Sequence, residues 1–236
     1  QNMHRAIGLV QRFYVLERGA VVLEGDGGNT AHREALVRRH NPVLQAVNAR
    51  SPLSVGNGEF AFTADVTGLQ SIAPAYEKGI PLCTQSQWGW HSFPNPDKYR
   101  IEEVYKEYDG QGRRIPYTYA FNANTGRKGL ASNYFRENAH RLNLGQIGFD
   151  LRHADGSAVK RTDIQHIRQV LDLWTGEIHS HFELDNQPVD VVTICHPDRD
   201  LVSIQVRSPL IQKKQLSIVL RFPYGSGDWE GQGGWD

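Results

Sequence analysis

Six short segments between residues 145 and 224 constrain the fold of this chain most strongly. In each of them apolar and polar residues alternate, which is the period of a half-buried β-strand. Because turns this short join antiparallel neighbours, we predict an antiparallel ladder. The segments are GQIGFDLRHADG, HIRQVLDLWTG, EIHSHFELDNQ, PVDVVTICHP, DLVSIQVRSP and QLSIVLRFPY, and the turn pairs are Asp155-Gly156, Thr175-Gly176, Asp185-Asn186, Pro197-Asp198 and Ser208-Pro209.

A seventh strand is predicted after Gly58, with Asp65 on its polar side and four apolar residues on the other: Phe60, Phe62, Ala64 and Val66. Short helices are predicted for AHREALVRRH, which follows Thr30, and for ASNYFRENAHRL, with a strand at IPYTYAF between them. We therefore predict a mostly β protein, an antiparallel β-sandwich with a few short helices.

The length of 236 residues suits one large domain or two small ones. Residues 1–30 are predicted to be an N-terminal appendage and residues 31–236 the sandwich domain. The glycine-rich end carries Trp229 and Trp235 without a closing element, so we interpret the chain as the front part of a larger protein.

The charge balance excludes two classes of partner. Lys and Arg number 26 and Asp and Glu also number 26, which gives no electrostatic reason to expect nucleic acid or a membrane surface. No apolar run is long enough to span a bilayer, and the first residues lack the pattern of a signal peptide. The two cysteines, Cys83 and Cys195, do not identify a compartment.

The loop at residues 79–98 concentrates residues that bind polar rings. Indole and imidazole each carry an N–H that needs a partner, while their flat faces suit the apolar C–H face of a sugar. The loop either packs into the sandwich edge or holds a ligand, and Asn57 in the Gly-Asn-Gly turn either forms a tight turn or contacts that ligand. The candidate binding residues are Gln85, Gln87, Trp88, Trp90, His91 and Asn57.

Other chemistries have weaker support. His179 and His181 share a strand face and His196 lies on the next strand, which is one way to hold zinc, iron or copper. The spacing of Glu183 does not suit a cupin-type site, so we expect polar residues on a sheet face, no metal and no cofactor. There is no Gly-x-Ser-x-Gly nucleophile motif and no phosphate-binding loop.

Glycoside cleavage needs two carboxyl groups on either side of the scissile bond. Several acids are available, but none has a context that singles it out as catalytic: Glu102, Glu103, Asp172, Asp198 and Asp200.

Five further motifs stand out: RRHNPVL, SPLSVGNGEFAFTADVTGLQ, GIPLCTQSQWGWHSFPNP, LDLWTGEIHSHFEL and the closing SPL with LRFPY. Together they resemble the N-terminal region of large bacterial proteins of the six-hairpin glycosidase superfamily. More distant relatives are the maltose phosphorylase and α-L-fucosidase families, in which a β-supersandwich precedes an (α/α)6 barrel. The chain lacks the helical run of such a barrel, and residues 1–30 lie outside the resemblance.

The resemblance implies a carbohydrate-processing protein, in the periplasm or outside the cell, whose acid and base lie on a barrel absent from this chain. It places the loop at 79–98 nearest the sugar or at the seam between domains. Two alternatives stay open: a free-standing carbohydrate-binding β-sandwich, and a metal-dependent β-barrel enzyme using the three histidines.

Overall fold

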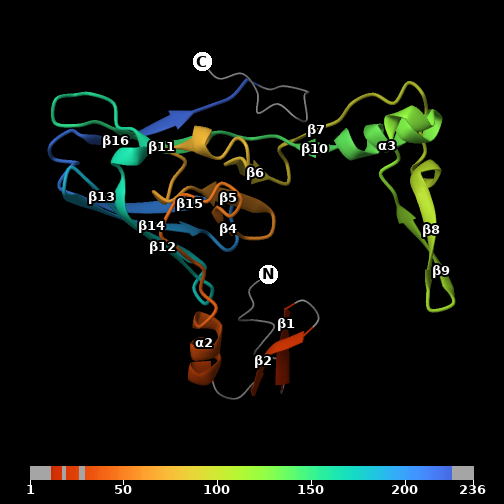
Figure 1. Cartoon of the computed structure of the whole chain (residues 1–236), viewed down its shortest axis with the longest axis horizontal. Coiled ribbons are helices and arrows are strands. Elements are labelled where there is room, and N and C mark those ends of the chain that lie inside the picture. Colours follow the sequence, from red (N-terminus) through yellow and green to blue (C-terminus); the bar gives the residue numbers. More distant parts are fainter. Residues whose placement is uncertain (1–11, 18–19, 27–29, 225–236) are drawn as a thin grey trace. The chain divides into compact units, whose positions relative to one another are not determined.

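The computed structural model describes residues 12–17, 20–26 and 30–224 (Figure 1). These residues are mostly β-strand in antiparallel sheets with a few short helices, so the predicted fold class is confirmed. The chain divides into two compact units, residues 1–86 with 144–222, and residues 87–143 with 223–236. This division cuts through the expected domain at 31–236, whose extent stays a prediction.

The larger sheet of the first unit has five strands in the order β15-β14-β13-β12-β3. Asp185 and Asn186, which form the turn of the β13–β14 hairpin, have φ values of 52° and 56°. Both residues therefore have the left-handed backbone conformation, which Asp and Asn adopt more readily than most other residues. The predicted antiparallel ladder is confirmed for the middle four of its six segments, whereas the first and the last segment pair with each other in a separate sheet. The strands of the five-stranded sheet are β3 (Val43–Leu44), β12 (Gln165–Asp172), β13 (Glu177–Leu184), β14 (Gln187–Cys195) and β15 (Val202–Arg207).

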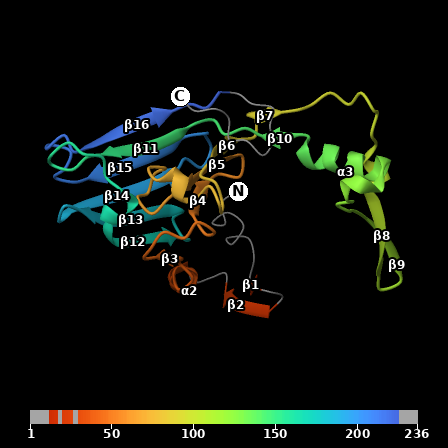
Figure 2. The same ribbon diagram turned by 45° about the horizontal axis from the view of Figure 1, so that its top comes forward.

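Two smaller sheets complete the sandwich (Figure 2). Phe62, Phe149 and Phe182 come from different sheets and are all buried in one core. Each fully buried side chain of this size contributes roughly 1.5–3 kcal/mol through the hydrophobic effect. The first small sheet pairs β11 (Gln146–Leu151) with β16 (Leu216–Arg221), and the second contains β4 (Leu53–Gly56), β5 (Phe60–Ala64) and β6 (Thr84–Ser86).

A buried polar segment follows β5 and corrects the prediction for Asp65. Its carboxylate is fully buried and accepts hydrogen bonds from the backbone N–H groups of Thr67 and Ile72, each at 2.7 Å. The Gln169 side-chain amide donates to the Asp65 carbonyl at 2.6 Å. The alternation predicts that Asp65 faces solvent, but the chain turns inward after β5, so a polar network replaces water there.

The second unit is built from short elements. A two-stranded ladder pairs β7 (Trp90–His91) with β10 (His140–Arg141), and a hairpin is formed by β8 (Tyr105–Gly110) and β9 (Arg113–Thr118). The predicted strand at IPYTYAF is β9, which begins two residues and ends three residues before the predicted bounds, whereas β8 is not predicted. The helices are η2 (Ile101–Val104), η3 (Ala123–Thr125) and α3 (Arg127–Glu137).

Two predictions for this region are wrong in their bounds. The helix α3 begins four residues before its predicted start and passes through Gly129. It ends at Glu137 because His140 and Arg141 pair with β7 instead of continuing the helix. The stretch 79–98 is likewise not a continuous loop, since it contains β6 and β7.

Near the N-terminus, β1 (Arg12–Glu17) pairs with β2 (Ala20–Asp26). The predicted helix after Thr30 is α2 (Thr30–Arg38), which begins one residue before and ends two residues before the predicted bounds. Two more short helices lie in the first unit, η1 (Ala73–Ala75) and η4 (Arg161–Asp163). Trp229 and Trp235 lie outside the described residues. Among the helices that the structure describes, none is long and apolar enough to cross a membrane.

Candidate functional site

The ladder of β7 and β10 gives the predicted binding loop a defined shape. Trp90 lies directly opposite Arg141, and His91 lies directly opposite His140. The Gly89 carbonyl accepts a hydrogen bond from the Leu142 N–H at 2.9 Å, which extends the pairing by one residue. Since directly opposite residues share a face and successive residues alternate, Trp90 and His91 point to opposite sides.

Two tryptophans lie at the surface of this ladder. The side chains of Trp88 and Trp90 are 66% and 54% exposed. The backbone N–H of Trp90 donates to the backbone carbonyl of Trp88 at 3.2 Å, which holds the two residues in one tight bend. The exposed guanidinium of Arg141 donates to the Gln87 carbonyl, so it lies beside the same bend. Two exposed indoles separated by a single residue are uncommon on a protein surface, and this bend is therefore the candidate binding surface.

Behind the ladder, His91 packs with Phe93 and His140. The His91 ring centroid is 4.9 Å from that of Phe93 and 5.4 Å from that of His140. Asn138 accepts the Phe93 N–H at 2.8 Å and so fixes the loop against the end of α3. His91 is therefore a half-buried support for the bend at Trp88 and Trp90, whereas the sequence predicts it as a binding residue.

The other candidates are divided between the two units. Gln87 is exposed in the bend itself, next to Trp88. Gln85 is half-buried in β6, opposite Ala61 of β5, and belongs to the first unit together with Asn57. The structure thus brings Gln87, Trp88 and Trp90 together.

Asn57 uses both ends of its amide within the first unit. Its oxygen accepts the N–H groups of Glu59 and Phe60 at 3.0 and 2.8 Å. Its nitrogen donates to the carbonyls of His196 and Arg199 at 3.4 and 3.1 Å. This arrangement favours the tight-turn interpretation of the Gly-Asn-Gly segment.

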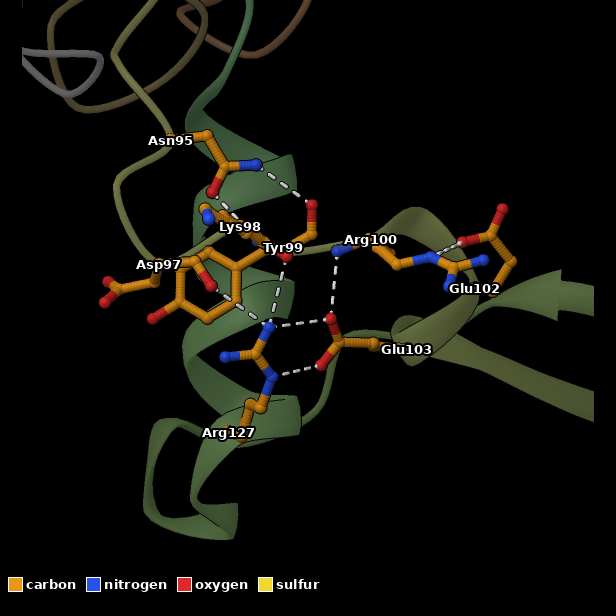
Figure 3. Close-up of polar contacts among 8 residues, drawn as sticks. All are labelled: Asn95, Asp97, Lys98, Tyr99, Arg100, Glu102, Glu103 and Arg127. Carbon is orange, nitrogen blue, oxygen red and sulfur yellow. Dashed lines mark hydrogen bonds and ion pairs between the residues drawn. The ribbon is translucent and has the colours of Figure 1, made fainter.

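The loop after β7 is fixed by an arginine that sequence reasoning missed (Figure 3). The Arg127 guanidinium donates Nε to Oε2 of Glu103 at 2.6 Å and Nη2 to its Oε1 at 3.0 Å. Nη2 also reaches the carbonyls of Asp97 and Lys98, and the guanidinium carbon lies 5.0 Å from the Tyr99 ring centroid. A bidentate pair of this kind is specific in geometry and holds the loop to α3.

The sequence offers no local signal for this clamp, because Arg127 and Glu103 are 24 residues apart. The hydrogen bonds from Arg127 and from the backbone of Arg100 lower the pKa of Glu103. Glu103 thus stays ionised at neutral pH and is unsuited to act as a general acid.

Three of the other four candidate carboxylates are held by neighbouring groups. Asp172 pairs with Arg38 and accepts the Trp174 N–H, and Asp200 accepts the Ser86 hydroxyl. Glu102 forms an exposed ion pair with Arg100 at 3.3 Å. Asp198 is exposed in the turn after β14.

The three histidines of the metal hypothesis have separate partners. His179 lies 3.0 Å from Glu177, and His181 lies 2.8 Å from Asp190. His196 lies past the end of β14, and its Nδ1 accepts the Asp198 N–H. Within the described part of the chain, no three His, Cys, Asp or Glu side chains come together in a metal-binding arrangement. The prediction that His196 lies on the next strand beside the pair is therefore wrong, because β14 ends at Cys195.

Comparisons with protein-family models, with curated proteins and with solved structures find no match to this chain.

Proposed function

We propose that this chain is the sandwich portion of a carbohydrate-processing, glycoside hydrolase-like protein. In this proposal the surface formed by Gln87, Trp88 and Trp90, named here the tryptophan bend, contacts a sugar ring. The catalytic acid and base then lie outside this chain. The exposure of both indoles in one hydrogen-bonded bend is the observation that carries the proposal.

The chemistry of the bend suits a saccharide. Indole faces bind the apolar C–H face of a pyranose, and amide or guanidinium groups bind its hydroxyls. Gln87 and Arg141 supply such groups beside the indoles. The rigid support from His91, Phe93 and Asn138 also favours binding, because a surface that is already ordered loses little entropy when a ligand docks.

The candidate acids support a binding role over a catalytic one. Glu103 and Asp172 are held by arginines, and Asp200 is held by a serine. A general acid for glycoside cleavage needs a raised pKa, whereas the pKa of Glu103 is lowered.

A further polypeptide layer is part of the proposal. Ile218 and Leu220 alternate along β16 on the same face as the buried Leu216, and Phe222 follows directly after the strand. All three apolar side chains are more than half exposed. A row of large apolar side chains on a sheet face is typical of a protein–protein interface. We assign this row to contact with the helical barrel that the family resemblance implies.

The second candidate function is a free-standing carbohydrate-binding sandwich, which the same exposed indoles favour. The two proposals differ in the row on β16. If the chain is a free-standing module, the Ile218→Ser and Leu220→Ser variants should bind sugar as tightly as the parent chain. Their solubility should also equal that of the parent chain. A module that docks on a barrel becomes more soluble with these substitutions.

A glycan titration followed by tryptophan fluorescence tests the proposed function. The expected result is a saturable change with at least one polysaccharide that Trp88→Ala and Trp90→Ala each reduce. A matched control is Trp174→Phe, which changes an indole in the other unit. Absence of a response to every glycan tested, or hydrolysis of a glycoside by this chain alone, contradicts the proposal.

A further inference from the structure

The β8–β9 hairpin lies almost entirely in solvent. Every residue of the two strands is exposed except Gly110, which is half-buried. Gln111 and Gly112 close it with φ values of 55° and 83°, which a two-residue hairpin turn requires. A two-stranded hairpin with no buried face is only marginally stable by itself. Both faces of this hairpin are open to a ligand.

The edges of this hairpin are poorly suited to pairing with another strand. Charged side chains occupy both strands, and Pro116 lacks an N–H in the middle of β9. Charges and proline on an edge strand prevent the addition of a further strand. A ligand is therefore expected on one of the two faces and not along an edge.

The two faces differ in charge. On one face Arg114 forms a 2.8 Å ion pair with Glu107, and Asp109 lies opposite Arg114. The other face has two cations and no acid among the residues of the two strands, and it also carries two tyrosine rings. We call it the tyrosine–cation face, and it consists of Lys106, Tyr108, Arg113, Ile115 and Tyr117.

The rings of this face are accessible. Tyr117 is 66% exposed, and Tyr108 and Ile115 are exposed directly opposite each other. The Lys106 ammonium lies 5.6 Å from the Tyr108 ring centroid and 4.6 Å from that of Tyr119, so the cation sits among the rings. The arrangement offers flat apolar surfaces and positive charge at the same place.

We infer that this unit binds a negatively charged saccharide, such as a chain of uronic acid or sulfated sugar units, on the tyrosine–cation face. Sugar rings stack on Tyr108 and Tyr117, and the acidic substituents pair with Lys106 and Arg113. The tryptophan bend of the same unit also has a cation, since Arg141 lies opposite Trp90. The inference rests on the proposed function and specifies the substrate class.

Two other anionic polymers compete with this assignment. Single-stranded nucleic acid also combines stacking with positive charge, but the proposed function of the same unit concerns sugar rings, and the oligothymidylate arm of the test below separates the two polymers. An acidic peptide has few rings to stack on the tyrosines. Charge complementarity together with ring stacking therefore favours the acidic saccharide.

The test compares polygalacturonate with the same polymer after complete methyl esterification, which removes the charge and keeps the backbone. Binding to the whole chain is measured by titration calorimetry at low salt. We expect tighter binding of the charged polymer and a loss of affinity as salt is raised. The Lys106→Gln/Arg113→Gln variant should bind it about tenfold more weakly, the effect of losing two exposed charge contacts.

Arg114→Gln is the matched control, because it removes one exposed arginine from the opposite face of the same hairpin. It should keep the affinity of the parent chain. Far-UV circular dichroism checks that each variant is folded.

The outcomes separate this inference from the proposed function. If neutral glycans bind at the tryptophan bend while the charged polymer binds no better than its ester, the inference fails and the proposed function stands. Equal binding of polyglutamate or oligothymidylate also overturns the inference, since the face is then a general anion surface. If no glycan of either kind binds, both proposals fail.

Discussion

Trp90 and Arg141 lie directly opposite each other on β7 and β10, so an indole and a guanidinium share the outer side of one short ladder. The neighbouring pair, His91 and His140, occupies the inner side with Phe93. The outer pair offers stacking and hydrogen bonding to a ligand, and the inner pair supports it. This division of roles leads to different predictions for residues that are adjacent in the chain.

Removal of an exposed tryptophan should leave the fold intact. We expect Trp90→Ala to change the free energy of unfolding by less than about 0.5 kcal/mol, as for most surface substitutions. The comparison is Phe62→Ala in the sandwich core, which should cost about 3–5 kcal/mol because Phe62 is fully buried. Denaturant unfolding measures both. A large loss of stability in Trp90→Ala contradicts its assignment to an open binding surface.

Asp65 should make the stability of the sandwich depend on pH. Burial raises the pKa of Asp65 from 3.8 to about 6, so the folded chain binds this proton more tightly than the unfolded chain does. Its contribution to stability is fully present below about pH 3.8 and is lost as the pH rises through about 6. The loss is on the order of 2–3 kcal/mol.

Unfolding free energies of the parent chain and Asp65→Asn at several pH values between 4 and 7 test this, because the difference isolates Asp65 from other titrating groups. His153 is one such group, since Asp185 and Asp163 raise its pKa and its contribution to stability is also lost with rising pH. Carbon-13 NMR titration of the Asp65 carboxyl gives an independent value. A pKa near 4 there would show that the network compensates for burial.

Gly68 should tolerate no side chain. Its φ is 86°, and a Cβ there would lie 2.9 Å from both the Ser180 hydroxyl and a Val191 methyl group. We expect Gly68→Ala to destabilise the sandwich by about 2–4 kcal/mol, the sum of backbone strain and overpacking. Gly156 has a φ of 83° with open space around it, so Gly156→Ala should cost only about 1–2 kcal/mol. Thermal unfolding measures both losses of stability. If Gly68→Ala and Gly156→Ala destabilise the chain equally, overpacking against Ser180 and Val191 does not contribute.

The Arg127–Glu103 clamp should control the order of the loop before the hairpin. Arg127→Ala removes the hydrogen bonds to Glu103 and to the Asp97 and Lys98 carbonyls. We expect several-fold faster amide hydrogen exchange across residues 97–104. The pKa of Glu103 should rise towards its ordinary value. Arg114→Ala, which breaks the exposed pair with Glu107, is the control and should leave that exchange unchanged. Unchanged exchange in Arg127→Ala would contradict the role of the clamp.

The sandwich is the part of the fold that the sequence predicts well, because alternation in β13 and β14 and the Asp185-Asn186 turn are local signals. Asp65 shows where this fails, since the period-two pattern places its side chain in solvent while the tertiary fold buries it. The hairpin strand β8 is missed because its sequence, YKEYDG, is almost entirely polar or charged.

The candidate site is predictable only in part. Two tryptophans in a proline-rich stretch indicate a binding surface, and both are exposed. The side chain of His91 points inward because β7 pairs with β10, which lies about fifty residues away in the chain. No local sequence pattern predicts this pairing. The Arg127–Glu103 clamp is missed for the same reason.

The most direct test of the account follows the indole N–H signals of Trp88, Trp90 and Trp174 by proton–nitrogen NMR as a glycan that binds is added. Trp-to-Phe variants assign the three signals. The account predicts that the signals of Trp88 and Trp90 shift in proportion to saturation while that of Trp174 stays in place. Saturable binding that leaves the Trp88 and Trp90 signals unchanged would contradict it.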